Sequence, residues 1–375
     1  LARIPFDGSV VSERARYLYV FQGLDKVEVD EAAAGEIVAV AGLEAVLIGE
    51  TLADPQAPAP LPPIRVGEPT VRMTFGVNTS PFAGREGRWG TSRKLRERLF
   101  DELRANVALR VTETDSAETF LVSGRGELHL AILIETMRRE GYEFQVSRPE
   151  VIFQRGENGE TLEPYEDVEI DADPDVVGAV VEMLGSRRGQ MLDMTNMPDG
   201  MTHLRYRVPV RGLLGFRHQF LTATRGQGVL TSAFHGYLPL AGAIAQRASA
   251  SIIAWEDGIT TTFGLKNAEE RGTLFYGPGV PVYEGMVVGE TPRPLDLTVN
   301  VCKKKHLTNM RSSNKDIEVR LTPPRELSLD EAIEYLAEDE LLEVTPAAFR
   351  IRKRVLDTEE RGKQTKKAKE LLGEG

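Results

Sequence analysis

TFLVSGRGELHLAILIETMRR, residues 119–139, is the stretch that most constrains the fold. Its first five residues are apolar or β-prone, as in a short strand, and Gly124 and Gly126 permit a tight turn after them. Glu127 then stands where the positive end of a helix would favour a carboxylate. Helical spacing continues through a stripe formed by Leu128, Ile132, Leu133 and Met137. The run predicts a strand at residues 119–123 and, after a tight turn, a helix at residues 124–139. By itself the glycine string indicates no more than a helix entry.

The flanking sequence completes a repeating unit. Around this stretch, the residue pattern predicts strands at 70–77, 107–113 and 142–146 and a helix at 92–105. The resulting order, βαββαβ, is the ferredoxin-like split-βαβ pattern. The same order recurs in the next segment, with strands predicted at 165–172, 189–196, 203–210 and 227–237 and helices at 174–185 and 212–223. Each antiparallel sheet would leave one face open to a partner.

We therefore expect an α+β and β multidomain chain of four parts. Residues 1–66 predict a partial β-barrel followed by a Pro-rich linker, because short alternating strands precede DPQAPAPLPP at 54–63. Residues 67–149 and 150–240 are the two ferredoxin-like domains. Residues 241–375 form a β-rich C-terminal domain with a short helix after the capping box at Ser328–Glu331, then a strand within 344–355 and a basic, frayed tail.

Charge is unevenly distributed along the chain. The net charge is −11, and residues 326–343 hold eight acids and no Lys or Arg. Such a protein would not bind nucleic acid through its overall field, so only local basic segments could do so. With one cysteine, Cys302, no membrane-length apolar run and no signal peptide, a cytoplasmic location is expected. The chain opens at Leu1 within a strand-like run, which suggests a fragment of a longer protein.

The most unusual basic segment is VCKKKHLTNMRSSNKD, residues 301–316, in which three lysines are consecutive. It shows no apolar periodicity and is therefore predicted to be a loop, here taken as residues 302–316. Adjacent ammonium groups repel one another, and phosphates of a nucleic acid would offset that repulsion. A solvated surface loop without a partner is an equally acceptable interpretation of the residues alone. The RNA-binding candidates in this segment are Lys303, Lys304, Lys305, His306, Asn309, Arg311, Ser312, Ser313, Asn314 and Lys315.

Catalytic motifs give little support to an enzyme. The string GREGRWGT at 84–91 lacks the Lys and hydroxyl of a phosphate-binding loop, so no nucleotide site is assigned. No CxxC or HExxH spacing indicates a metal, and no cofactor is expected in this chain. His218 and His235 lack a nucleophile motif nearby, and a structural role is the simpler interpretation. An enzyme would instead require a pocket that gathers one of them with carboxylates.

Several strings together resemble one family. GRGELHL at 124–130, followed by a second split-βαβ unit, resembles the third and fifth domains of elongation-factor-G-like translational GTPases. Further strings, which run from the second split-βαβ unit to the C-terminal region, resemble the TypA/BipA branch of that family. They are SRRGQM (186–191), VPVRGLLGFR (208–217), TRGQGVL (224–230), FHGYLP (234–239), NAEERGTLFYGPGVPVYEGMVVGE (267–290), CKKKHLTNMRSS (302–313) and VTPAAFRIRKRVL (344–356).

The resemblance implies a C-terminal fragment whose GTPase domain, with its GTP and Mg, is missing. It implies ribosome binding near the factor site, with 23S rRNA, A-site tRNA and ribosomal proteins as partners, and a link to large-subunit assembly and stress adaptation. Loop 302–316 would reach towards the peptidyl-transferase centre. Further RNA-binding candidates are Arg350, Arg352, Lys353 and Arg354, and more weakly Arg187, Arg188 and Arg225. The fragment is expected to be monomeric and without catalytic residues. A protein–protein adaptor using the acidic helix at 326–343 and the open sheet faces is the alternative.

Overall fold

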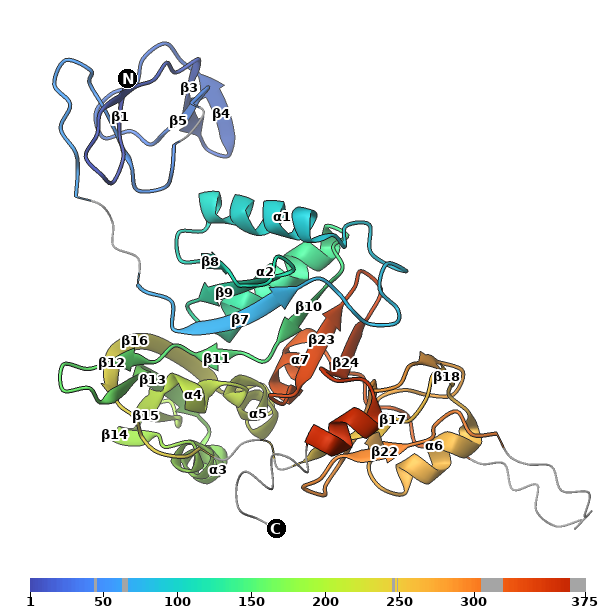
Figure 1. The fold of residues 1–375 in the computed structure, drawn as a ribbon. Helices are drawn as coiled ribbons and strands as arrows, with labels where there is room; N and C mark the ends of the chain where they lie inside the picture. The colour runs from blue at the N-terminus through green and yellow to red at the C-terminus, as the bar shows by residue number, and fades with distance from the viewer. Residues whose placement is uncertain (44–45, 63–66, 245–246, 248, 305–319, 365–375) are drawn as a thin grey trace, which may run out of the picture. The chain divides into compact units, whose positions relative to one another are not determined.

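The computed structural model describes residues 1–43, 46–62, 67–244, 247, 249–304 and 320–364. The chain divides into two compact units, Leu1–Gly67 with Leu99–Leu109, and Glu68–Arg98 with Arg110–Gly375. The architecture is α+β, as predicted, and consists mostly of antiparallel sheets (Figure 1). Within the described residues, no helix combines the length and apolarity that a membrane span requires.

The N-terminal residues form two three-stranded antiparallel sheets. Their orders are β2-β1-β6 and β4-β3-β5, and no pairing among the described residues joins one sheet to the other. The first sheet contains β1 (Ala2–Ile4), β2 (Val11–Ser12) and β6 (Thr51–Ala53). The second contains β3 (Tyr17–Gln22), β4 (Asp25–Glu28) and β5 (Val38–Ala41). The partial barrel expected for this part remains a prediction.

The first βαββαβ series is present. The strand order β10-β7-β9-β8 is the ferredoxin-like arrangement. Its elements are β7 (Val71–Gly76), α1 (Ser92–Ala105), β8 (Arg110–Glu113), β9 (Thr119–Gly124), α2 (Glu127–Arg139) and β10 (Phe144–Ser147). A short strand, β11 (Glu150–Val151), also pairs with β7.

Helix α2 buries only part of the expected stripe, because Leu133 and Met137 are buried as predicted but the other two members are not. Leu128 and Ile132 were predicted to point inward but are 47% and 58% exposed. The buried stripe consists of Leu130, Ala131, Leu133, Ile134 and Met137. Apolar residues occupy more than one side of this helix, so two stripes satisfy the helical period. Local spacing could not decide between them.

The second series repeats the ferredoxin-like order, β16-β13-β15-β14. Its elements are β12 (Gln154–Arg155), β13 (Thr161–Ala172), α3 (Pro174–Ser186), β14 (Gln190–Asn196), β15 (Thr202–Pro209), α4 (Val210–Leu213), α5 (Phe216–Ala223) and β16 (Val229–Pro239). The single helix predicted at 212–223 is wrong, because Gly215 has φ 69° and separates α4 from α5. Aliphatic and aromatic side chains from β13, β15, α3 and α5 form one core.

The C-terminal part builds a four-stranded sheet, β19-β21-β17-β22. Its elements are β17 (Ala250–Ala254), β18 (Gly258–Ile259), α6 (Thr262–Glu269), β19 (Thr273–Leu274), β20 (Pro281–Val282), β21 (Val287–Thr291), β22 (Leu297–Val299) and α7 (Leu329–Tyr335). The capping box at Ser328 and Glu331 is confirmed. Helix α6 was not predicted, although Thr261 before it is a recognisable N-cap residue.

The last two strands do not join the C-terminal sheet. They extend the sheet of the first ferredoxin-like series. A single strand was predicted within 344–355, but a hairpin forms from β23 (Glu340–Val344) and β24 (Phe349–Lys353). β23 pairs with β10, giving the order β24-β23-β10-β7-β9-β8 (Figure 1). Because these partners are about two hundred residues apart, no local pattern could reveal the pairing.

A buried carboxylate secures this junction. Glu343 is fully buried and accepts hydrogen bonds from Asn78 Nδ2 (3.0 Å), Ser80 Oγ (2.9 Å) and Tyr283 OH (2.9 Å). Arg350 donates to the same carboxylate at 3.1 Å. A buried charge is tolerated only when it is paired and hydrogen-bonded, and here four donors meet that requirement.

Replacing Glu343 with Ala should therefore lower the free energy of unfolding by about 3–5 kcal/mol, since Arg350 would lose a buried partner. The matched control is Glu150→Ala, which removes an exposed ion pair to Arg72 (3.4 Å). This substitution should change the free energy of unfolding by less than about 1 kcal/mol. Urea denaturation of both variants measures the difference. Equal losses would contradict this role for Glu343.

Candidate nucleic-acid interface

Only the first residues of the predicted basic loop, 302–304, lie within the described part of the chain. Lys303 and Lys304 are exposed, and within the described residues neither side chain forms an ion pair. The remaining candidates lie outside the described residues: Lys305, His306, Asn309, Arg311, Ser312, Ser313, Asn314 and Lys315. The RNA-binding role of this segment remains a prediction.

The segment's entry is fixed to the start of α6. Thr261 Oγ1 donates to the Lys303 carbonyl (2.5 Å) and also accepts from the Gly264 amide (3.0 Å), so one hydroxyl caps the helix and holds the chain. The Thr261 amide donates to the Val301 carbonyl at 3.0 Å. A Cβ atom at Gly264 would lie 2.4 Å from that carbonyl oxygen, which explains the glycine. These contacts fix the backbone where the lysines begin.

The segment's exit is fixed to the end of the same helix. Glu269 accepts from the Thr322 amide (2.5 Å) and from Lys266 Nζ (2.9 Å). The hydrogen bonds from Thr322 and Lys266 lower the pKa of Glu269 to about 2. Leu321 packs against the core that includes Val301. The chain is thus held before and after residues 305–319 by one eight-residue helix that the sequence analysis did not predict.

Cys302 lies between these anchors. It packs against the same core as Val301, and burial raises the pKa of its thiol, with Glu256 and Asp257 adding to the effect. Adjacent ammonium groups would by themselves lower the pKa of a thiol. Burial dominates, so this thiol has a packing role and is not activated.

The second group of RNA-binding candidates lies on β24 and is largely engaged inside the chain. Arg350 forms ion pairs with Glu86 and Glu343. Arg352 is 2% exposed and donates to Thr79 Oγ1 (2.7 Å) and Gln145 Oε1 (2.5 Å). Both guanidinium groups are thus engaged by internal acceptors, although the Nε of Arg352 is buried without a hydrogen-bond partner among the described residues.

Lys353 and Arg354 complete this group. The Lys353 ammonium is buried among Asp296 (2.5 Å), Asp339 (2.9 Å) and Glu340 (3.0 Å). Those carboxylates raise its pKa despite the opposing effect of burial. Arg354 remains exposed, with its Nε donating to the Glu338 carbonyl at 3.1 Å. Of the four candidates, Arg354 alone presents an exposed guanidinium.

The three weaker candidates lie at turns of the second ferredoxin-like sheet. Arg187 donates to the carbonyls of Gly212 (2.9 Å) and Leu214 (3.0 Å), so it supports the α4–α5 connection. Arg188 has φ 64° and donates to the Ala243 carbonyl at 3.1 Å. Arg225 has φ 52° and is exposed. Only Arg225 is fully available on the surface.

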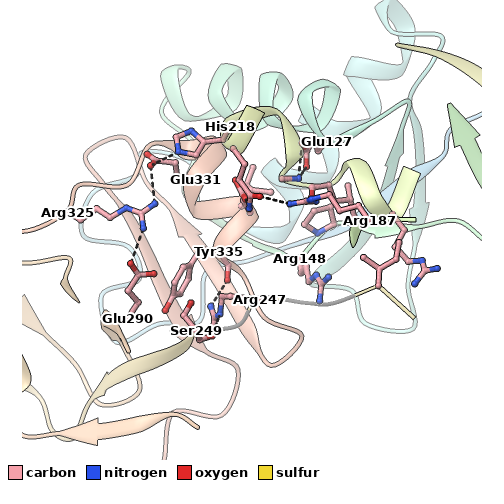
Figure 2. Close-up of a pocket in the computed structure, with 18 residues that line it drawn as sticks. Glu127, Arg148, Arg187, His218, Arg247, Ser249, Glu290, Arg325, Glu331 and Tyr335 are labelled. Atoms are coloured by element: carbon pink, nitrogen blue, oxygen red, sulfur yellow. Dashed lines mark hydrogen bonds and ion pairs between the residues drawn. The ribbon is translucent and has the colours of Figure 1, made fainter. Parts of the chain in front are cut away.

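Two strings noted in the sequence meet at a polar pocket of about 420 Å³ (Figure 2). Glu127, from the string at 124–130, accepts from the Gly215 amide (3.1 and 3.3 Å), from the string at 208–217. Gly215 needs its positive φ, and a Cβ there would lie 2.5 Å from the Glu334 side chain on α7. The pocket's charged lining is Glu127, Arg148, Arg187, Arg211, His218, Arg247, Glu290, Arg325, Glu331 and Glu334.

This pocket gathers a histidine with carboxylates, which is what the enzyme alternative requires. His218 Nε2 lies 3.5 Å from Glu331, and Arg325 bridges Glu331 (3.2 Å) and Glu290 (3.1 Å), as Figure 2 shows. Among the described hydrogen bonds, none joins His218 to a hydroxyl or thiol nucleophile. The geometry is that of a charge network joining three parts of the second unit.

Comparison with known proteins defines the class first. Residues 160–248 match the family profile described as elongation factor G C-terminus. This region includes most of the second ferredoxin-like unit, so that unit is of the elongation factor G C-terminus type.

The adjoining region gives the particular family. Residues 249–358 match the TypA/BipA C-terminal domain and therefore belong to that domain family. The chain is 51% identical to the large ribosomal subunit assembly factor BipA of Synechocystis sp., over 94% of this chain and 59% of the relative. It is 48% identical to the protein of that name from Bacillus subtilis, over 97% of this chain and 59% of the relative. The chain thus spans about three fifths of these relatives' length.

One solved crystal structure, of a protein from Thermus thermophilus, shares 18% sequence identity. The similarity covers 64% of this chain and 51% of that one, with a TM-score of 0.39.

The pocket makes stability depend on pH. Burial raises the pKa of Glu127 to about 7, with the Glu334 and Asp330 charges adding to the effect and the Gly215 amide opposing it. Because this pKa exceeds the ordinary value of 4.5, the stability contributed by Glu127 is full below pH 4.5 and is lost as the pH rises through 7. Each pKa unit corresponds to about 1.4 kcal/mol.

Glu127→Gln should abolish this dependence. Unfolding free energies of the parent and of Glu127→Gln are measured from pH 4.5 to 8. As the pH rises, the parent should lose stability relative to Glu127→Gln. The exposed Glu157→Gln variant should follow the parent curve throughout. A constant difference between parent and Glu127→Gln across this range would show that Glu127 does not titrate in the folded chain.

Proposed function

We propose that this chain is the ribosome-binding C-terminal portion of a TypA/BipA-like translational GTPase that acts in assembly of the large ribosomal subunit. The support is the match of residues 249–358 to the TypA/BipA C-terminal domain and the similarity to relatives named as assembly factors. GTP binding and hydrolysis are assigned to a domain outside this chain. The proposed partners are 23S rRNA, A-site tRNA and ribosomal proteins, in the cytoplasm.

The observation that carries the proposal is the anchoring of the basic segment. Its first residues are held at Thr261, the chain beyond it is held at Glu269, and its first two lysines are exposed without an internal acid among the described residues. In a chain of net charge −11, cations left unpaired beside a rigid helix are suited to phosphate contacts. Arg350, Arg352 and Lys353 contrast with them, because internal partners already engage those side chains.

The acidic run at 326–343 favours this proposal over the adaptor alternative. A protein adaptor would present those carboxylates to a basic partner. Several of them instead bind cations of the same chain: Glu331 pairs with Arg325, Glu340 with Arg247, and Glu343 with Arg350. The acidic run is therefore used largely for internal stabilisation.

Replacing Lys303, Lys304 and Lys305 with Ala should weaken binding to purified large ribosomal subunits. The thermal midpoint should stay nearly constant, because the two described lysines are exposed and make no ion pair within the described chain. Each lost phosphate contact should reduce the log–log salt slope of binding by roughly 0.7–0.9. Co-sedimentation across a salt series measures both quantities.

The matched control removes three exposed cations elsewhere, through Arg14→Ala, Lys26→Ala and Arg110→Ala. This control has the same change in net charge and should retain the parent's affinity and salt slope. Equal weakening by the two triple variants would indicate a general charge effect. Unchanged sedimentation of the Lys303–Lys305 variant would contradict the proposal.

A further inference from the structure

The connection between β7 and α1 is organised around a second buried carboxylate. Glu143, 3% exposed, accepts from the Gly84 amide (2.7 Å) and the Gly87 amide (2.8 Å). Asn78 Nδ2 donates to Glu143 (2.9 Å) and to Glu343 (3.0 Å). A Cβ atom at Gly87 would lie 2.2 Å from Glu143 Cβ, so a glycine is needed there. The string GREGRWGT is therefore a closely supported loop.

Backbone pairing holds the second half of the loop. The amides of Arg88 (2.9 Å) and Trp89 (3.2 Å) donate to the Gly141 carbonyl, and the Glu143 amide donates to the Trp89 carbonyl (2.9 Å). On the inner side, the Phe82 ring meets Tyr283 edge to face, with centroids 4.9 Å apart. The loop is consequently rigid at both ends before any partner arrives.

Cations and aromatic rings alternate on this support. The Arg85 guanidinium lies over the Phe82 ring at 4.4 Å, and the Arg88 guanidinium lies over the Trp89 ring at 4.6 Å. Lys94 Nζ approaches the same indole at 5.6 Å. Such stacking favours the charged groups and restricts their rotamers, so less entropy is lost when they bind a partner.

The nearby acids are directed elsewhere. Glu86 turns towards Thr345 and Arg350, while Glu97 pairs with Arg93 (2.9 Å) and Lys94 (2.7 Å). Within the described residues, neither the Arg85 nor the Arg88 guanidinium forms an ion pair, and both side chains are exposed. Arg85 still contributes to the electrostatic field that lowers the pKa of Glu86, but among the described residues neither guanidinium is closed off by a direct ion pair.

We propose that residues 82–94, which comprise the end of the β7–α1 loop and the first residues of α1, are a second RNA-binding site that takes a single-stranded segment. Arg85 and Arg88 bind its phosphates, and a base stacks on the Arg88–Trp89 pair. Guanidinium groups match phosphate oxygens bidentately, and aromatic rings interleaved with cations suit exposed bases. An acidic peptide would use the cations but would leave the indole without a role. The site is separate from the Lys303–Lys305 segment and goes beyond the function proposed above.

Intrinsic fluorescence tests this site directly. The chain has two tryptophans, so Trp255→Phe leaves Trp89 as the single indole reporter. Titration of that variant with decauridylate should quench its fluorescence. Adding Arg85→Ala and Arg88→Ala should weaken binding at least tenfold and reduce the salt slope by about 1.4, which corresponds to two phosphates at 0.7 each for a single strand. Near-UV circular dichroism should confirm that the loop is still folded.

Two controls separate this proposal from the others. Lys303→Ala, Lys304→Ala and Lys305→Ala in the Trp255→Phe background should leave the quenching unchanged, and polyglutamate should not quench. Arg85→Lys with Arg88→Lys should restore part of the affinity, because charge returns without the planar guanidinium. The proposal would be overturned if decauridylate caused no quenching, or if the Arg85→Ala, Arg88→Ala variant bound as tightly as its parent. It would also be overturned if the Lys303→Ala, Lys304→Ala, Lys305→Ala variant lost the quenching, or if polyglutamate quenched equally.

Discussion

The second unit depends on two carboxylates that have been removed from water. Glu143 directly precedes β10, and Glu343 lies within β23. These two strands pair with each other. Asn78 donates to both. An ionised carboxylate in such a place is stable only if donors surround it, so each acid requires a set of neighbours. Those neighbours are glycine amides, Ser80, Tyr283 and Arg350, drawn from segments far apart in the sequence.

This requirement separates the basic residues into two kinds. Arg350 and Lys353 complete internal ion networks, and Arg352 is buried with hydrogen-bond acceptors. Lys303, Lys304, Arg85 and Arg88 remain exposed without an ion pair in the described part of the chain. A cation with an internal partner contributes mainly to stability, whereas an unpaired one retains its attraction for phosphate. The positions of the acids therefore determine which cations are available to a partner.

Local patterns predicted the parts of the fold that depend on local physics. Helix α1 has the predicted bounds, and the capping box at Ser328 is present. Both ferredoxin-like orders followed from alternation and helical spacing. Errors arose where distant contacts decide the outcome. The α2 face, the break at Gly215 and the β10–β23 pairing depend on neighbours that the local sequence does not contain.

The same division applies to the candidate site. Composition identified the lysine run, but it gave Arg352 the same standing as Lys303, because only tertiary structure shows which charge is enclosed. The anchoring role of α6 was also missed. Thr261, followed by a short helical run ending at Glu269, was the available signal.

In the proposed function, the segment beginning at Lys303 contacts ribosomal RNA, while the cations of β24 stabilise the protein itself. A photoreactive amino acid placed at position 304, followed by irradiation with large ribosomal subunits and mapping of the products, tests it most directly. The account predicts cross-links to 23S rRNA from position 304 and none from the exposed position 205 on β15. Cross-links to protein alone, or equal RNA cross-linking from both positions, would contradict it.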